Sequence, residues 1–128
     1  MVIDTSAILA ILFHEEDALE LARAIETASV RRVSAATLLE AAIVIETRYG
    51  EAGGEKLDQF LAAAGVQIDP VTEGQSAVAR AGFRTYGKGR HPAGLNFGDC
   101  FAYALAKVTD ESLLFKGNDF THTDVKRV

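Results

Sequence analysis

The sequence predicts an α/β fold in which helices cover both faces of a short, mostly parallel sheet. Short apolar runs such as Val2-Ile3 and Leu113-Leu114-Phe115 have the composition of strands that are buried on both faces. Longer segments with apolar residues at helical spacing separate these runs, and strands that alternate with helices usually form parallel sheets. We therefore expect a three-layer α/β/α sandwich. No linker, repeat or low-complexity tract divides the chain, so residues 1–128 are expected to form one domain.

In the first half of the chain, strands are expected at residues 1–3 and 30–34, and helices at residues 6–13, 15–28, 36–49 and 55–64. Leu19, Ala22 and Ile25 recur at the spacing of one helical face. Gly50 and the pair Gly53-Gly54 are typical of a helix end. They predict that residues 36–49 and 55–64 form two separate helices.

In the second half, strands are expected at residues 66–71 and 113–115, helices at 72–86 and 96–108, and a Gly- and Pro-bearing loop at 88–95. Thr72 is of a type that caps the start of a helix, and Gly87 is of the type that follows its end. The tail from Thr121 is a candidate edge strand.

Composition excludes several classes of protein. No apolar run reaches the ~20 residues of a membrane helix, and no basic segment precedes the longest run, so we expect neither a membrane span nor a signal peptide. The single cysteine, Cys100, rules out an internal disulfide, favours a reducing cytoplasm and is expected to be a small buried hydrophobe. A formal net charge of −5 argues against bulk coating of nucleic acid and leaves room for a local basic groove.

Four acids lie where one predicted element gives way to the next: Asp4, Glu40, Asp99 and Asp119. Strand ends and helix starts on one edge of an α/β sheet converge on one crevice. Each acid also has an ordinary structural reading. The stretches from Thr37 to Glu40 and from Asn96 to Asp99 fit capping boxes, Asp4 could cap the first helix, and Asp119 could form an Asx turn.

The four acids together are harder to explain as caps and turns, because apolar or aromatic residues flank Asp4, Asp99 and Asp119. Two ionised carboxylates about 5 Å apart repel by roughly 3 kcal/mol at an effective dielectric of about 20. Either some acids are protonated or they hold a metal. An all-oxygen set selects Mg²⁺ or Mn²⁺, and the three histidines lack the spacing of a zinc site.

Four segments that contain these acids resemble PIN-domain nucleases, and the resemblance covers essentially the whole chain. The segments are Val2 to Ala7, Ser34 to Glu40, Leu95 to Ala104 and Leu114 to Phe120. The last two are especially similar to VapC, the toxin of bacterial and archaeal toxin–antitoxin pairs. Many relatives carry an acid a residue or two before Asp119, where this chain has Asn118.

The resemblance implies a PIN-like fold in which Asp4, Glu40, Asp99 and Asp119 form the catalytic set. It also implies Mg²⁺ or Mn²⁺ as cofactor, RNA as substrate, a homodimer, and a VapB-type antitoxin that blocks the site. Asp4 and Asp99 are the first choices for metal ligands, and Asp119 completes the shell directly or through water. Glu40 could act through water or as a general base. The supporting residues are expected to be Thr5, Ser6, Asn96 and Asn118, although the first three could instead serve as helix caps.

RNA approaching an acidic site needs cations beside it. Arg80, Arg84 and Lys88 recur every four residues, Arg90 and His91 follow on the loop, and Lys116 stands near Asp119. As a set they are candidates for phosphate contacts, the alternative being a solvated face. Arg31 and Arg32 are expected to be surface charges at a strand edge. The apolar segments Ile8 to Phe13 and Ala41 to Ile45 exceed the needs of one small core, so part of them is expected to bind VapB or a second copy.

The sequence thus favours a cytoplasmic, metal-dependent endoribonuclease that acts as the toxin of a type II toxin–antitoxin system. Two alternatives keep the same fold: a PIN-domain nuclease of RNA maturation and a catalytically idle PIN fold that serves as a scaffold. A phosphotransfer domain with Asp4 as phospho-acceptor is disfavoured, because the second Asp two positions later is missing.

Overall fold

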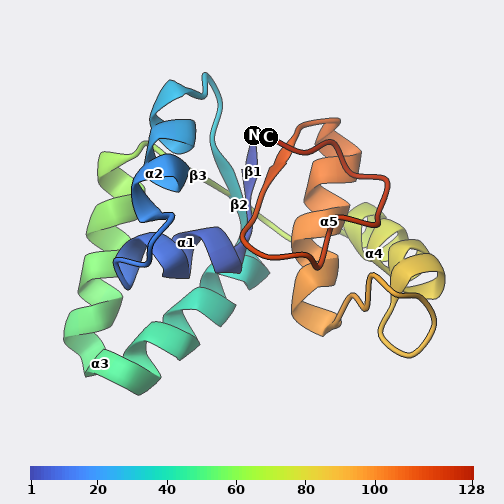
Figure 1. Ribbon diagram of the computed structural model, residues 1–128, viewed down its shortest axis with the longest axis horizontal. Coiled ribbons are helices and arrows are strands. Elements are labelled where there is room, and N and C mark those ends of the chain that lie inside the picture. Colours follow the sequence, from blue (N-terminus) through green and yellow to red (C-terminus); the bar gives the residue numbers. More distant parts are fainter.

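A four-stranded parallel sheet forms the centre of the computed structural model, which describes residues 1–128 (Figure 1). Its strands lie in the order β3-β2-β1-β4. Val2 pairs with Arg32 on one side and with Leu113 on the other. The strands are β1 (Val2–Ile3), β2 (Arg32–Ser34), β3 (Gln67–Asp69) and β4 (Leu113–Leu114).

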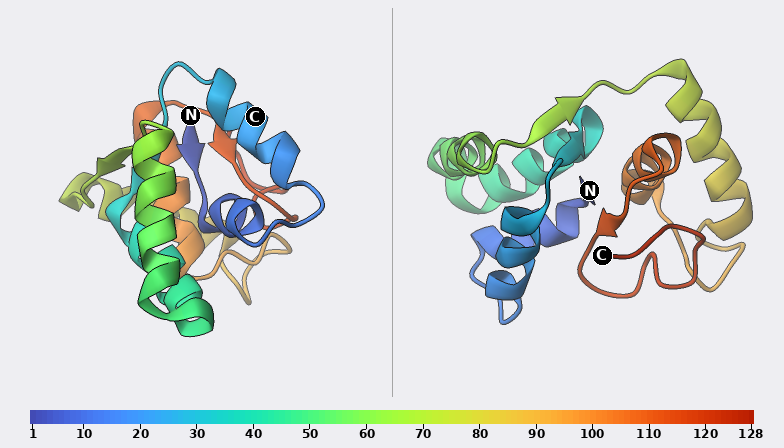
Figure 2. Two further views of the ribbon diagram at one scale, coloured as in Figure 1. Left: turned by 90° about the vertical axis from the view of Figure 1, so that its left-hand side faces the viewer. Right: turned by 90° about the horizontal axis from the view of Figure 1, so that it is seen from above.

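Helices cover both faces of this sheet, which confirms the predicted α/β/α sandwich. In Figures 1 and 2, the helices α1 (Thr5–Leu12), α2 (Ala18–Thr27) and α3 (Ala35–Ala63) lie together on one side. On the other side lie α4 (Glu73–Tyr86) and α5 (Phe97–Thr109), with the C-terminal segment beside them. No helix is both long and apolar enough to cross a bilayer.

Each face of the sheet has its own apolar cluster, and the two residues of β1 contribute one side chain to each. Ile3 packs with Ile8, Val33 and Leu57 in the cluster under α1 to α3. Val2 belongs to the cluster around α5. Successive side chains of a strand point to opposite faces, so a strand covered on both sides must be apolar at every position.

The prediction of two helices at residues 36–49 and 55–64 is confirmed, and the second helix begins earlier than expected. Gly50, with φ 67° and ψ −162°, is not helical, so α3 (Ala35–Ala63) consists of two helical segments that meet at a kink there. Gly53 and Gly54 lie in the segment after the bend, close to the last turns of the segment before it. An added Cβ would meet Tyr49 and Ile45 at Gly53, and Glu46 at Gly54.

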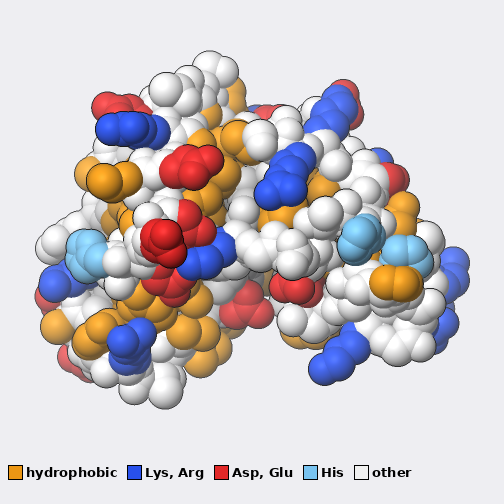
Figure 3. All heavy atoms as spheres, viewed as in Figure 1, with side chains coloured by type: hydrophobic (Ala, Val, Ile, Leu, Met, Phe, Trp, Pro, Cys, Tyr) orange, Lys and Arg blue, Asp and Glu red, His pale blue; other side chains and the backbone are white.

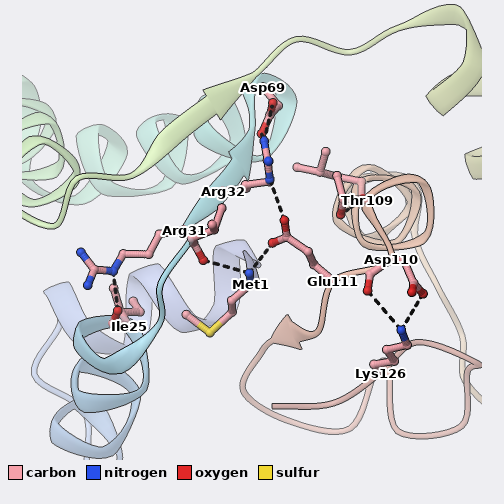
Figure 4. A network of polar contacts seen from close by, with 11 residues as sticks. Met1, Ile25, Arg31, Arg32, Asp69, Thr109, Asp110, Glu111 and Lys126 are labelled. Carbon is pink, nitrogen blue, oxygen red and sulfur yellow. Dashed lines mark hydrogen bonds and ion pairs between the residues drawn. The ribbon is translucent and has the colours of Figure 1, made fainter.

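Arg31 and Arg32 are structural rather than loose surface charges. The Arg31 guanidinium donates to three backbone carbonyls, including Ala64 O at 2.7 Å. Arg32 donates to Glu111 Oε1 at 2.8 Å and lies 3.3 Å from Asp69 Oδ1, and Glu111 also contacts the amino group of Met1 (Figure 4). The sequence missed this role because the partners lie far along the chain.

The tail after Phe120 adds a single bridge to the sheet and no strand. Arg127 pairs with Leu113 at the edge of β4. Asp124 holds the tail against α5, since it accepts hydrogen bonds from Tyr103 Oη at 2.9 Å and Lys107 Nζ at 2.8 Å. Burial raises the pKa of Tyr103, and its hydrogen bond to the Asp124 carboxylate adds to this rise.

Candidate active site

The candidate site lies at the carboxyl end of β1, where the strand order reverses. The chain passes from β1 to β2 on one side of the sheet, while β4 pairs with β1 on the other. Such a switch point is where open α/β sheets bind their ligands. Asp4 directly follows β1, and Asp119 lies in the loop after β4. Figure 3 shows Asp and Glu side chains on both sides of the hollow below the sheet.

Asp4 is buried, with 4% of its surface exposed, and caps α1. Its Oδ2 accepts hydrogen bonds from Ser6 N at 2.9 Å and from Ser6 Oγ at 2.6 Å. Burial raises the pKa of Asp4; the Ser6 hydrogen bonds oppose this rise, and the negative charge of Glu40 adds to it. The expected role as a helix cap is confirmed, and the same carboxylate still faces other acids.

Asp99 is 8% exposed and forms the predicted capping box at the start of α5. Asn96 N donates to Asp99 Oδ2, and Asp99 N donates to Asn96 Oδ1, both at 2.9 Å. Burial raises the pKa of Asp99 to about 7, against the opposing effect of the Asn96 hydrogen bond. The negative charges of the other three acids, Asp4, Asp119 and Glu40, raise the pKa of Asp99 further. The structure therefore brings all four acids into electrostatic contact.

Glu40 is not part of a capping box. Ser34 caps α3, and its side chain accepts a hydrogen bond from Ala36 N at 3.3 Å. Glu40 therefore lies in the second turn of α3, and its side chain does not take part in capping. Its carboxylate packs on the backbone of Gly98, where an added Cβ would collide with Glu40 Oε2. Gly98, next to Asp99, is therefore a site residue that the sequence did not single out. The signal in the sequence that could have identified it is a glycine inside a predicted helix, where glycine destabilises the helix by about 1 kcal/mol relative to alanine.

Thr5 and Ser6 are not helix caps, because Asp4 fills that position. Thr5 Oγ1 donates to the carbonyl of Thr37 at 3.3 Å and so links the starts of α1 and α3. Thr37 itself is buried, and its hydroxyl has no hydrogen-bond partner. Ser6 Oγ, besides donating to Asp4, accepts from Lys116 N at 3.0 Å. These hydroxyls connect the three segments that carry Asp4, Glu40 and Asp119.

Asp119 is exposed, as is its neighbour Asn118. The turn there is closed by the backbone, with Thr121 N donating to Asn118 O at 3.0 Å. The Asx-turn interpretation of Asp119 finds no hydrogen bond to support it. Its carboxylate is thus the most solvated of the four.

The donor set suits a hard cation. It is all oxygen, and Oδ2 of both Asp4 and Asp99 is held by hydrogen bonds while Oδ1 is not. Burial raises the pKa of Asp99, and the negative charges of the other three acids add to this rise. No three of the acids converge closely enough to enclose a bare ion. Mg²⁺ usually keeps several waters and takes only one or two carboxylates directly, so this arrangement fits a hydrated cation.

The predicted phosphate-binding cations fall into two groups. Arg80 and Arg84 on α4 and Lys88 and Arg90 on the next loop are exposed and form no ion pair. Figure 3 shows Lys and Arg side chains on both halves of the molecule, including the edge where α4 and the following loop lie. Lys116 differs, because its Nζ contacts Glu15 and lies 3.0 Å from Asp17 Oδ1. Its charge is already matched by two carboxylates.

Exposed apolar side chains flank the acids. Phe97, the first residue of α5, is 80% exposed and packs edge-on against Phe101 with ring centroids 4.9 Å apart. It separates two grooves, one of about 370 Å³ beside α4 and one of about 440 Å³ beside α3. Leu39 and Ile43 line the second groove and are 61% and 57% exposed. The expected surplus of apolar surface is therefore present on α3, close to Glu40.

Comparison with known proteins gives consistent matches over the full length. The model of the PIN domain family matches residues 1–126. A ribonuclease VapC of Mycolicibacterium smegmatis is 56% identical over 128 residues, which cover 100% of this chain and 99% of that protein. The crystal structure of Mycobacterium tuberculosis VapC20, a sarcin–ricin loop cleaving toxin, matches with a TM-score of 0.78 at 18% identity, over 99% of this chain and 97% of that one. A toxin–antitoxin complex from Klebsiella pneumoniae matches with a TM-score of 0.69 at 18% identity, over 96% and 92%.

Proposed function

The chain belongs to the PIN-domain family and is a VapC ribonuclease, the toxin of a toxin–antitoxin pair, and from this premise we propose that Asp4, Asp99 and Asp119 hold the Mg²⁺ or Mn²⁺ with which it cuts RNA. The observation that carries the proposal is the geometry: buried Asp4 and Asp99 follow β1 and open α5 at the switch point of the sheet, where their charges and those of Glu40 and Asp119 repel one another. A divalent cation would offset this repulsion. When bound, it would lower the pKa of a water and stabilise negative charge on the phosphate.

Each acid has a distinct role in this proposal. Asp4 and Asp99 would hold the cation, and the hydrogen bonds of Ser6 and Asn96 to Oδ2 leave the other oxygen of each carboxylate available to it. Ser6 and Asn96 thereby fix the orientation of the ligands. Asp119, which is exposed, completes the shell directly or through water. Asn118, its exposed neighbour, is proposed to contact the same water shell or the RNA.

Glu40 is the best candidate for the general base. Gly98 allows its carboxylate to lie against the start of α5, next to Asp99. A carboxylate at the edge of the acid cluster can accept a proton from the attacking water without taking a ligand position. Thr5 supports this arrangement by joining α1 to the Thr37 carbonyl one turn before Glu40.

RNA is proposed to reach the acids across α4 and the loop that follows it. The exposed, unpaired cations there, Arg80, Arg84, Lys88 and Arg90, are suited to contact phosphates. Their charge would compensate for a chain whose net charge is −5. We expect the protein to act in the cytoplasm, because its proposed substrate, RNA, is found there.

A VapB-type antitoxin and a second copy of the chain are the proposed protein partners. The exposed apolar side chains beside the acids, Leu39, Ile43 and Phe97, are unusual for a surface that faces only water. A partner that covered them would also block access to Glu40 and Asp99. Light scattering of the toxin with and without its antitoxin measures both assemblies.

Cleavage of a defined RNA by purified protein tests the proposal. Wild-type protein should cut in Mg²⁺ or Mn²⁺ and stop in EDTA, and Asp99→Asn should be inactive while it keeps its fold by circular dichroism. Full activity of Asp99→Asn would exclude this site. Growth arrest on expression without antitoxin, with mapping of the RNA ends, separates a toxin from a maturation nuclease or an idle scaffold.

A further inference from the structure

Lys116 connects three segments around the acid cluster. Its backbone N–H donates to Ser6 Oγ at 3.0 Å, and Ser6 Oγ donates to Asp4 Oδ2 at 2.6 Å. Its ammonium group contacts Glu15 and lies 3.0 Å from Asp17 Oδ1, in the connection between α1 and α2. One residue thus joins the loop after β4 to the start of α1 and to the segment after its end.

We propose that Lys116 is a positioning residue for Asp119, which holds the loop after β4 in place for cation binding, and is not a contact for RNA phosphate. This inference rests on the proposed function, because it takes Asp119 to be part of the cation site. It replaces the expectation, drawn from sequence alone, that Lys116 binds RNA.

The Asp119 loop needs such an attachment because, apart from the hydrogen bond from Thr121 N to Asn118 O, little else fixes its middle. Phe115 and Phe120 anchor its two ends in the core, with ring centroids 5.2 Å apart. Between them, Gly117 has φ 90°, a conformation that favours glycine, and the Asp119 side chain accepts no hydrogen bond. Lys116 therefore makes the polar contacts that hold this part of the loop to α1 and its neighbours.

Backbone hydrogen bonds fix the segment that carries the two acids beside the Lys116 ammonium. Glu15 N donates to Ala10 O at 3.0 Å, and Ala18 N donates to Glu15 O at 3.0 Å, so backbone hydrogen bonds fix this connection to both helices. The three side chains are about equally half-buried, with 36% of Lys116, 39% of Glu15 and 34% of Asp17 exposed. With two carboxylates on one ammonium, no positive charge remains to attract a phosphate.

Binding of Mn²⁺ to the RNA-free protein tests the role of Lys116. Paramagnetic resonance of free Mn²⁺ measures the affinity without any catalytic step. In Lys116→Met, which keeps the length of the side chain, the dissociation constant should rise about tenfold, the usual effect of losing a group that positions a ligand. Lys107→Met is the matched control: Lys107 is also 36% exposed and pairs with an acid, Asp124, on the tail. It should bind Mn²⁺ like the wild type.

Removal of the two acids distinguishes positioning from RNA contact and does not alter Lys116 itself. Glu15→Gln with Asp17→Asn should also weaken Mn²⁺ binding, although the lysine is now free to attract RNA. RNA affinity in EDTA should stay within twofold of wild type in Lys116→Met. A wild-type Mn²⁺ affinity in both variants, or a clear loss of RNA affinity in Lys116→Met alone, would overturn the inference.

The same measurements separate this inference from the proposed function. Asp99→Asn should abolish specific Mn²⁺ binding if the acids form the cation site. If Asp99→Asn binds Mn²⁺ as the wild type does, the proposed cation site is wrong, and the role of Lys116 is lost with it. If only Asp99→Asn is impaired, the cation site stands and Lys116 has no positioning role.

Discussion

The carboxylate of Glu40 lies directly on the backbone of Gly98, at the start of α5. This contact joins the proposed general base to the helix that carries Asp99, and a methyl group would break it. We expect Gly98→Ala to lower the rate of RNA cleavage at least tenfold, because Glu40 must move away from its position beside Asp99. Single-turnover cleavage at saturating Mn²⁺ measures the effect.

Gly74 supplies the control for that substitution. It is the second residue of α4, as Gly98 is of α5, and an added Cβ would meet only Thr72 Oγ1 at 3.8 Å. Gly74→Ala should keep full activity and gain up to about 1 kcal/mol of stability from helix propensity. Equal activity of the two variants would mean that the position of Glu40 is unimportant.

The stability of the metal-free protein should fall as the pH rises from about 4 to about 7. Burial raises the pKa of Asp99 from 3.8 to about 7. Across this window the folded protein keeps a proton that the unfolded chain has lost, so a rise in pH favours unfolding. Thermal unfolding in EDTA measures this trend. In Asp99→Asn the fall should be smaller, and Mg²⁺ should raise the wild-type midpoint most at pH 8. A wild-type curve parallel to that of Asp99→Asn would contradict the assignment.

Loss of the cations on α4 and its following loop should weaken RNA binding and its dependence on salt. The change is Arg80→Gln, Arg84→Gln and Lys88→Gln together, in the inactive Asp99→Asn background. If all three contact phosphates, the slope of log affinity against log salt should decrease by about 2. Fluorescence anisotropy at several salt concentrations measures this slope.

A double variant of two exposed cations on the opposite half of the molecule, Arg23→Gln with Lys56→Gln, is the control. Its slope should equal that of the parent protein. If both variants lose the same affinity for each charge removed, RNA responds to overall charge, and α4 and its following loop have no special role.

Breaking the ion-pair network of Arg32 should destabilise the fold by about 1 to 2 kcal/mol. Arg32→Met leaves Glu111 and Asp69 without their shared cation, and these acids are only 21% and 15% exposed. Urea unfolding gives the free energy, with exposed Arg23→Met as control. In a Glu111→Gln background the same change should cost less, and an unchanged cost would mean that packing of the Arg32 side chain dominates.

Much of the fold followed from local pattern. Apolar strands, helical spacing and the capping box from Asn96 to Asp99 depend on near neighbours in the sequence, and the structure confirms them. Glu40 was harder to interpret, because Ser34, three residues before Thr37, takes the capping role. The partners of Lys116 could not be predicted, since Glu15 and Asp17 are about one hundred residues away and only the folded chain brings them together.

The pairing of β1 with β4 determines when the acids can first meet. These neighbouring strands come from opposite ends of the chain, and Val2 and Ile3 bond in register with Leu113 and Leu114. During translation, Asp4 leaves the ribosome well before Asp119. The nascent chain therefore lacks a complete set of acids until the loop after β4 has been made. The order of synthesis itself delays cleavage of RNA by this protein until β4 pairs with β1.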